Sequence, residues 1–389
     1  MQISIVTRRV GVNDGQGRVN LEIATEALRQ GHRVRLVCER VDPALIAAGA
    51  VAELLPPPSF LPTRLLKDQL FAWRNSARLA RFEKDDAVLA CGFATWASVD
   101  VNAVHFVHRA WLASPYHPWR LSHNPRALYG RVYTGANASL ERIAFRRSGA
   151  IVAVSDKVRH ELIEAGVPGE RVVTILNGVD TGEFHPGPAQ RRDFGLPEQV
   201  TIGLFAGDLK TPRKNLDTVL RALAEVPGLH LAVAGRHEAT PWPAMAEALG
   251  LRDRVHFLGF QTDMAALMRS VDLFVFPSRY EACSLVLLEA LASGLPVLTA
   301  DSAGGAEMIT PDVGVVLADC DDWAGLAASL RRLLAEPGRR RAMAEAGRQL
   351  ALAHSWPAMA RRYLGLLEQS VERRRFAKPA TAQMGSANA

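Results

Sequence analysis

Cysteine is scarce in this chain of 389 residues, and its four cysteines lie far apart at Cys38, Cys91, Cys283 and Cys320. They show neither the spacing of metal ligands nor the density of a disulfide framework. Folds held together by a structural metal or by disulfides are therefore excluded. We expect four free thiols in or near hydrophobic cores.

Long apolar runs are also missing. No uninterrupted stretch reaches the roughly 18 apolar residues that a bilayer-spanning helix requires. The first residues, Met1 to Val6, are typical of a strand and lack the character of a secretory signal peptide. We therefore expect a cytoplasmic protein.

Acidic residues are fewer than basic ones, 40 against 46, so the formal net charge is +6 and the pI is about 9.4. This excess admits nucleic acid, an anionic membrane surface or phosphorylated ligands as partners. No nucleic-acid motif accompanies it, so we expect no nucleic-acid partner. Basic and aromatic residues are instead interleaved from Arg64 to Tyr133, a mixture typical of a peripheral surface against the lipid headgroups at the inner face of the cell membrane. These residues are Arg64, Lys67, Arg74, Arg78, Arg81, Arg109, Arg120, Arg126 and Arg131 with Phe71, Trp73, Trp111, Tyr116, Trp119, Tyr129 and Tyr133.

The chain length suits two domains of roughly 150 to 200 residues each. Apolar, strand-like runs alternate with helical segments over almost the whole chain, which predicts an α/β fold with two doubly wound, Rossmann-like parallel sheets. We expect strands at 3–6, 34–38, 87–91, 103–107, 150–154, 172–176, 201–205, 230–234, 255–258, 273–276, 297–299 and 314–317.

Turn residues without periodicity, from Gly182 to Pro188, predict the linker between the two domains. We accordingly expect one domain at 1–182 and a second at 183–355. A helical segment follows at 356–375, and the remaining residues, 376–389, are expected to be disordered because they lack an apolar pattern.

The segment from Arg279 to Val297 places two carboxylates around the start of an apolar helix. Ser284 is a candidate N-cap, and Gly294 is expected to end the helix. Glu289 would then be a carboxylate inside a core, which requires hydrogen-bond donors, and the two hydroxyls of a ribose would supply them. Glu281 precedes the helix, where the first amide groups favour an anion such as a sugar phosphate. The alternative is a Glu289 that forms an ion pair with a neighbouring arginine.

Cations occupy the junction between the strand at 201–205 and the next helix. Arg213 and Lys214 stand where ligands of parallel sheets bind, and either could neutralise a diphosphate leaving group without a metal. The alternative is that these two cations lie at the solvent-exposed start of a helix and bind no ligand.

Gly15 and Gly17 precede a helix expected from Arg18 to Gln30, and glycines there would let the backbone approach a ligand closely. A dinucleotide fingerprint is disfavoured because Asn20 stands where the third glycine belongs.

The pair Glu281 and Glu289, separated by seven residues, resembles the motif of the family-4 type of retaining glycosyltransferases, which have the two-domain GT-B fold. In that family, the first Glu holds hydroxyls of the donor sugar, the second holds the ribose, and backbone N–H groups after the first Glu contact the diphosphate. The resemblance implies these roles for Glu281, Glu289 and the backbone of Cys283, Ser284 and Leu285. The chain departs from the common Gly-Phe-Gly at Ala282-Cys283-Ser284.

The resemblance also implies a role for further positions. The family places a Lys at the diphosphate, which favours Lys214 over Arg213, and its glycine loop lines the cleft, as Gly15 and Gly17 would. A His at the end of a first-domain strand contacts the donor sugar near the reacting carbon. Because we expect His105 and His108 to point to opposite faces of that strand, His108 is the candidate, with a core histidine as the alternative. The helix at 356–375 would return to the first domain.

The resemblance implies an enzyme whose second domain binds a nucleoside diphosphate sugar and whose first domain binds a glycan or lipid-linked acceptor across a central cleft. We expect retaining transfer of a hexose from a UDP-linked donor to an acceptor hydroxyl in lipopolysaccharide or exopolysaccharide synthesis, with no cofactor and no metal. The triplet Asp319-Cys320-Asp321 fits a metal motif by letters alone, and we interpret it as a surface turn. The alternatives are a nucleotide-sugar 2-epimerase of the same fold and a catalytically idle partner subunit.

Overall fold

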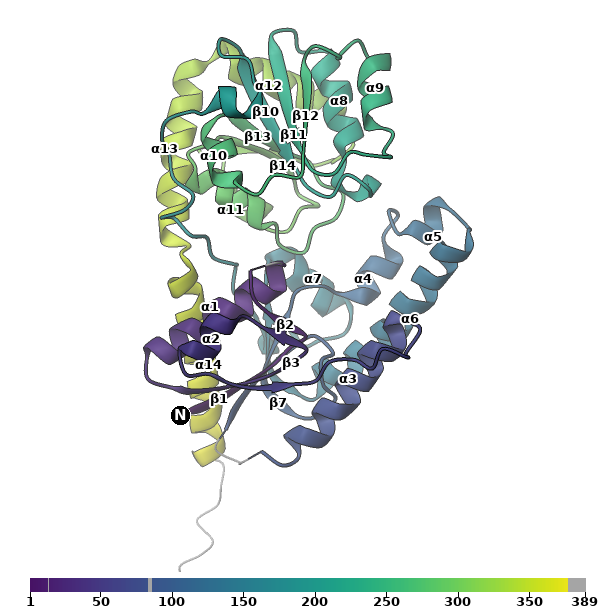
Figure 1. The fold of residues 1–389 in the computed structure, drawn as a ribbon, viewed down its shortest axis with the longest axis vertical. Helices are drawn as coiled ribbons and strands as arrows, with labels where there is room; N and C mark the ends of the chain where they lie inside the picture. The colour runs from purple at the N-terminus through teal and green to yellow at the C-terminus, as the bar shows by residue number, and fades with distance from the viewer. Residues whose placement is uncertain (13, 83–85, 377–389) are drawn as a thin grey trace, which may run out of the picture.

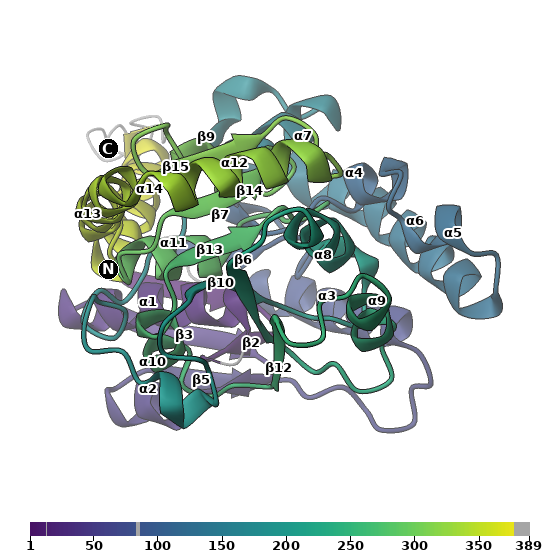
Figure 2. The same ribbon diagram turned by 90° about the horizontal axis from the view of Figure 1, so that it is seen from above.

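The computed structural model describes residues 1–12, 14–82 and 86–376. Figure 1 shows two sheets, one above the other along the long axis, with α13 and α14 running along one side. Both sheets are parallel, and helices cover their faces (Figures 1 and 2). Within the described residues, every helix is too short or too polar to cross a membrane. The expected disordered residues 377–389 lie outside the described part, whereas Phe376 ends α14.

The first sheet has seven strands in the order β5-β3-β1-β6-β7-β8-β9. Its central strand β6 is a continuous apolar run, as expected where helices cover both faces of a parallel sheet, whereas β3 and β7 also contain charged residues. The strands are β1 (Gln2–Val6), β3 (Arg33–Cys38), β5 (Val51–Leu54), β6 (Ala87–Cys91), β7 (Val99–Val104), β8 (Ser148–Ala153) and β9 (Val172–Thr174), and a separate pair is formed by β2 (Arg9–Val10) and β4 (Arg40–Val41).

The second sheet has six strands in the order β12-β11-β10-β13-β14-β15. Its order reverses direction at β10 and β13, and ligands of such sheets bind beyond the carboxyl ends of the strands at that point. The strands are β10 (Thr201–Ala206), β11 (Leu229–Ala234), β12 (Val255–Gly259), β13 (Leu273–Phe276), β14 (Val297–Ala300) and β15 (Gly314–Leu317).

Helices cover both sheets and build a separate core for each. In both views, α5 and the nearby end of α6 project away from the body of the molecule (Figures 1 and 2). The helices are α1 (Gly15–Arg29), α2 (Pro43–Ala47), α3 (Arg64–Leu79), α4 (His108–Ala113), α5 (Pro118–Leu121), α6 (Pro125–Arg146), α7 (Asp156–Glu164), α8 (Leu216–Ala224), α9 (Trp242–Ala248), α10 (Met264–Arg269), α11 (Leu285–Ala292), α12 (Trp323–Ala335), α13 (Pro337–Ala353) and α14 (Trp356–Phe376).

The chain crosses between the two sheets twice, and the crossings lie side by side. Val179 forms a parallel bridge with Ser355, and its N–H donates to His354 O at 2.9 Å. Beyond this point, α14 packs against α1, and its buried Trp356, Tyr363 and Leu367 belong to the core of the first sheet. The last helix thus ties the C-terminal segment to the N-terminal unit.

Two expected elements differ most from their bounds in the structure. The strand expected at 103–107 is β7, which runs from Val99 to Val104, because its polar residues are satisfied internally: Asp100 accepts the Val88 N–H at 2.8 Å, and Asn102 donates to Gly92 O at 2.9 Å. The helix expected from 18 to 30 is α1, which already begins at Gly15. Its N-cap is Asp14, whose carboxylate accepts the Gly17 N–H at 2.7 Å.

Candidate active site

Glu289 lies on α11, the most apolar helix of the second unit. This helix begins after Ser284, which occupies the N-cap position but makes no capping bond through its side chain, and it ends at Ser293 before Gly294. Gly294 adopts φ of +74°, so the prediction that it ends the helix is confirmed. Leu285 and Glu289, one turn apart, share a face, and Leu285 packs against the core of the first unit. Glu289 is therefore half-buried toward the first unit and not enclosed in the core.

The Glu289 carboxyl has no hydrogen bond or ion pair with any part of the chain that the structure describes. Its pKa is raised to about 7, mainly by burial and also by the negative charge of Glu183, whereas Arg18 of α1 opposes this rise. The alternative of an arginine partner is not seen, since the Arg18 guanidinium binds Glu22 at 2.7 Å. A desolvated carboxyl without a protein partner fits a site for hydroxyl donors from a ligand.

Glu281 lies with the two cations that the sequence analysis singled out. Lys214 Nζ is 2.5 Å from Glu281 Oε1, and Arg213 Nη1 is 3.5 Å from the same oxygen. Burial lowers the pKa of Lys214, whereas Glu281 raises it. The structure therefore brings Glu281 together with Arg213 and Lys214, which precede it by almost 70 positions in the sequence.

Asn215 holds these cations in place. It adopts φ of +67°, an uncommon conformation for a residue other than glycine, at the N-cap of α8. Its side-chain amide is buried and donates to Pro277 O at 2.8 Å and Cys320 O at 2.7 Å. The loop that carries Lys214 is thus fixed to the loops after β13 and β15, a function that the sequence analysis did not assign to Asn215.

The backbone at the start of α11 is partly occupied. The Ser284 N–H donates to Gly304 O at 2.9 Å, so this predicted diphosphate contact is already satisfied within the protein. Burial raises the pKa of Cys283 to about 12, which leaves a neutral thiol packed beside a core of the first unit. Gly15 lies opposite, where a Cβ atom would be 3.5 Å from Leu285. A Cβ at Gly17 would lie 2.8 Å from Gly11 O, so a glycine is required there.

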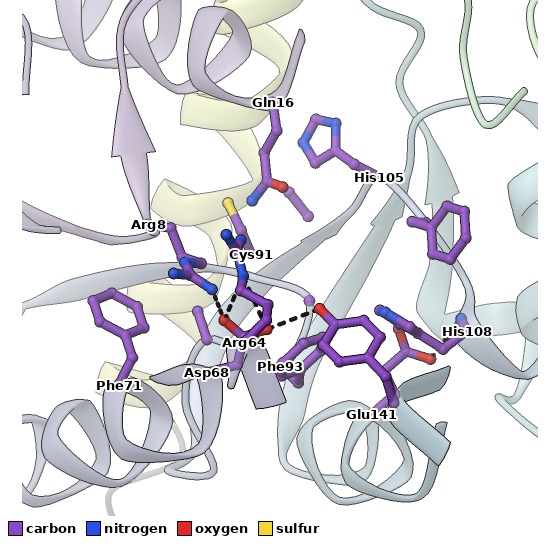
Figure 3. A pocket seen from close by; sticks show the side chains of 15 residues that line it. Arg8, Gln16, Arg64, Asp68, Phe71, Cys91, Phe93, His105, His108 and Glu141 are labelled. Atoms are coloured by element: carbon purple, nitrogen blue, oxygen red, sulfur yellow. Dashed lines mark hydrogen bonds and ion pairs between the residues drawn. The ribbon is translucent and has the colours of Figure 1, made fainter. Parts of the chain in front are cut away.

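A cavity of about 190 Å³ lies in the first unit, and Figure 3 shows its lining side chains. His108 is the first residue of α4, not the last of a strand, and its Nδ1 lies 2.5 Å from Glu141 Oε1. His105 lines the same cavity, so the expectation that the two histidines point to opposite faces is wrong. It fails because β7 ends at Val104, before either histidine.

The two histidines have different surroundings. Figure 3 shows His108 beside Glu141 and His105 beside Gln16. The His108 N–H also donates to Glu141 Oε2 at 2.9 Å, so both its backbone and its ring are tied to one buried carboxylate. Burial lowers the pKa of His105 to about 4, and its Nε2 has no partner in the described chain. Nothing in the sequence links Glu141 to a histidine 33 positions away.

The cavity also accounts for part of the interleaved basic and aromatic segment. Arg64 Nε lies 3.0 Å from Asp68 Oδ1, and the Tyr133 hydroxyl donates to Asp68 Oδ2 at 2.8 Å. Arg8 binds the same carboxylate and Glu39. Phe71 is buried. Phe71 and Tyr133 of that segment therefore contribute to the cavity instead of an outer surface, whereas Arg64 remains exposed at its edge.

The two units meet around the residues that precede α11. The buried Tyr280 donates to Glu161 of α7 at 3.1 Å, and the Ser155 hydroxyl donates to Ala282 O at 2.5 Å. Glu307 accepts the Asp156 N–H at the start of α7 at 2.7 Å, so it caps a helix of the opposite unit. The loop that precedes α11 and the first unit are thus in direct contact.

The Asp319-Cys320-Asp321 triplet is also part of this contact. Its three possible ligand atoms lie within 4.8 Å of one another, and Cys320 is buried. Asp321, however, is bound to Arg279 at 2.8 Å and accepts the hydroxyl of Tyr116 from the first unit at 2.9 Å. The triplet lies in a turn with Asp319 exposed, as expected, and it also forms an interdomain contact.

Comparison with known proteins places these observations in a family. Residues 13–183 match the model of Glycosyltransferase Family 4, and residues 188–350 match that of Glycosyl transferases group 1. The D-inositol 3-phosphate glycosyltransferases of Mycobacterium tuberculosis H37Rv and of M. bovis AF2122/97 are each 35% identical over 204 residues, which is 49% of this chain. The match covers 42% of the length of those relatives, less than half of each.

Solved structures with the same architecture cover nearly the whole chain. WaaG, a glycosyltransferase involved in lipopolysaccharide biosynthesis, has a TM-score of 0.73 at 24% identity and covers 94% of this chain and 99% of its own. Anabaena HepE in complex with UDP and glucose has a TM-score of 0.70 at 19% identity over 95% of this chain and 100% of its own. These likenesses establish the GT-B fold, and the family matches, which together extend from residue 13 to residue 350, show that the chain belongs to the family-4 glycosyltransferases.

Proposed function

We propose that the protein transfers a hexose, with retention of configuration, from a UDP-linked donor to a hydroxyl of a cell-envelope glycan or lipid-linked acceptor. The observation that carries this proposal is Glu289. It is a desolvated carboxyl without a protein partner, on the face of α11 that is turned toward the opposite unit. The two hydroxyls of a ribose would satisfy it.

The remaining donor contacts follow from the cluster beside the start of α11. Lys214 and Arg213 converge on Glu281 at 2.5 Å and 3.5 Å, and both cations are within reach of a diphosphate that displaces part of this pairing. Glu281 would then accept hydroxyls of the sugar. A protein of the same fold has been solved with UDP and glucose, so the fold accommodates such a donor.

The chemistry of the transfer would be mainly electrostatic. Glu281 is held by two cations, which makes it a poor nucleophile, so we assign no covalent intermediate to it. The departing phosphate would accept the proton of the acceptor hydroxyl on one face of the sugar, and Lys214 would stabilise its developing charge. His108 and the α1 start at Gly15 and Gly17 would line the acceptor side, and the contact of the units through Tyr280 would exclude water.

Calorimetry with nucleotides tests the assignment of Glu289. We expect the parent protein to bind UDP, to bind GDP more weakly, and to lose at least tenfold in UDP affinity on Glu289→Gln, because the neutral amide accepts fewer hydrogen bonds. Glu372→Gln, an exposed position on α14, is the matched control and should bind like the parent. Equal binding of UDP by the parent and Glu289→Gln would disprove the ribose assignment.

A product assay separates transfer from epimerisation. With UDP-glucose alone, an epimerase would change the configuration of the donor, whereas the proposed transferase would leave it intact apart from slow hydrolysis. Addition of an acceptor hydroxyl should then release UDP. Conversion of the donor sugar without an acceptor would replace the proposed activity by epimerisation.

A further inference from the structure

A second cavity, of about 310 Å³, lies on the first unit and shares no lining residue with the cavity beside His108. It is bounded by the first turn of α4, the last turns of α6, and the turn after α7. Four arginines line it, and no carboxylate does. Its lining residues are Arg109, Arg142, Phe145, Arg146, Ala165, Gly166, Val167, Pro168 and Arg171.

Three of these arginines are exposed and have no partner. Arg109, Arg142 and Arg146 form no ion pair or side-chain hydrogen bond with residues in the described ranges. Arg171 forms the fixed part of the wall, since its guanidinium donates to Phe145 O at 2.9 Å and binds Ser148 O. The cavity therefore presents three guanidinium groups, unpaired among the described residues, beside Arg171, whose orientation is fixed by its hydrogen bonds.

The placement of these charges is unfavourable without an anion. Arg142 and Arg146 are four residues apart on α6, where like charges repel. Arg109 lies in the first turn of α4, where the helix dipole disfavours a cation. The dipole at the C-terminal end of α6 favours Arg146, but it explains neither Arg109 nor Arg142. A ligand that carries at least two negative charges would remove all of these repulsions.

We propose that this cavity binds a phosphorylated group, with Arg109, Arg142 and Arg146 as its ligands. Guanidinium groups bind phosphate oxygens in a bidentate manner, and three of them around one cavity suit a phosphate monoester or a diphosphate. The site is independent of the transfer site, because it uses neither Lys214 nor Glu289. The same chemistry is available from a free phosphorylated compound and from the headgroup of an anionic lipid.

Titration with inorganic pyrophosphate tests the site directly. The full chain is first saturated with UDP, so that the nucleotide site is filled, and pyrophosphate is then added at low and at high salt. We expect binding that weakens with salt, and at least a tenfold loss of affinity in Arg142→Gln/Arg146→Gln. The control Arg33→Gln/Arg341→Gln removes the same charge from two exposed, distant arginines and should bind like the parent. Equal affinity in all three proteins, or no binding by the parent, would overturn the proposal.

Two further measurements keep the result interpretable. Without ligand at low salt, Arg142→Gln/Arg146→Gln should melt at or above the parent temperature because repulsion is relieved, which excludes misfolding as the cause of lost binding. Vesicles containing phosphatidic acid then identify the source. Sedimentation that this double variant loses assigns a lipid headgroup, whereas pyrophosphate binding without sedimentation assigns a free phosphorylated ligand.

Discussion

At the scale of single residues, the titration of Glu289 links the site to stability. An ionised carboxyl without a partner is costly in a desolvated position, and this cost raises the pKa of Glu289 to about 7 from the ordinary 4.5. Between these values the folded protein binds more protons than the unfolded chain. The free energy of unfolding must therefore fall as the pH rises from about 4.5 to 7.

Glu289→Gln should remove this pH-dependent loss of unfolding free energy. At pH 8 we expect the variant to be more stable than the parent by up to about 3 kcal/mol, since the shift of the pKa is worth about 1.4 kcal/mol per unit. At pH 4 the difference should vanish. Urea unfolding at the two pH values measures it, and a variant that is less stable than the parent at pH 8 would show that Glu289 has a favourable partner.

Substitution of Lys214 distinguishes an effect on catalysis from an effect on folding. If it stabilises the departing phosphate, Lys214→Ala should lower the transfer rate by about 10²- to 10³-fold. Lys210→Ala, in the same loop but exposed, is the control and should retain the parent rate. The assay is UDP release with a saturating acceptor, and a parent-like rate for Lys214→Ala would refute the assignment.

At the scale of elements, the sequence predicted most strands but few of their polar details. Apolar runs such as 201–205 and 230–234 correspond to β10 and β11 because buried parallel strands need continuous hydrophobicity. The start of β7 was missed because Asp100 is hidden within it, bound to a backbone amide of β6. The edge strand β5 was missed because it has only four residues, Val51–Leu54, with a glutamate among them.

The candidate site likewise contains residues that local motifs predict and residues that they do not predict. Glu281, Lys214 and Glu289 could be predicted from local motifs, since each belongs to a short segment with its own pattern. Glu141 and Asn215 could not, because their partners come from distant parts of the chain through packing.

The first turn of α1 gives a prediction that depends on one glycine. An added Cβ at Gly17 would approach Gly11 O to 2.8 Å and the Asp14 carboxylate to 3.1 Å. Gly17→Ala should therefore destabilise the protein by about 1–3 kcal/mol, as overpacked sites do. Gly130→Ala, within α6 and with open space around it, should be neutral or stabilising by up to about 1 kcal/mol. Urea midpoints of the two variants should thus move in opposite directions.

The expectation of membrane binding now rests on exposed apolar residues of α3 and α6. Trp73 is 59% exposed and Val132 is 54% exposed, although Phe71 of the same segment is buried. We propose that these helices bind an anionic membrane. Trp73→Ser/Val132→Ser should then reduce sedimentation with phosphatidylglycerol vesicles at least threefold. Val12→Ser/Phe260→Ser, which removes two exposed apolar groups outside α3 and α6, is the control. No sedimentation of the parent at low salt would remove the proposal.

At the scale of the whole molecule, polar contacts between the two units add to the apolar packing of α14 and Leu285. Tyr116 is one that lies outside the proposed donor site: its hydroxyl donates to Asp321 at 2.9 Å, and Arg279 lies over its ring. Each such hydrogen bond contributes about 1 kcal/mol, so its loss should shift an equilibrium between closed and open arrangements by about fivefold.

Tyr116→Phe removes this bond and keeps the ring. We expect a larger radius of gyration than the parent in small-angle scattering without ligand, and the same radius once UDP-glucose is bound, because donor contacts to both units would restore closure. Tyr129→Phe, whose hydroxyl accepts from Leu65 within the first unit, should scatter like the parent in both states. If Tyr116→Phe were as compact as the parent without ligand, the contact with Asp321 would not help to hold the two units closed, and closure would depend on Tyr280, Ser155 and the helix cap at Glu307.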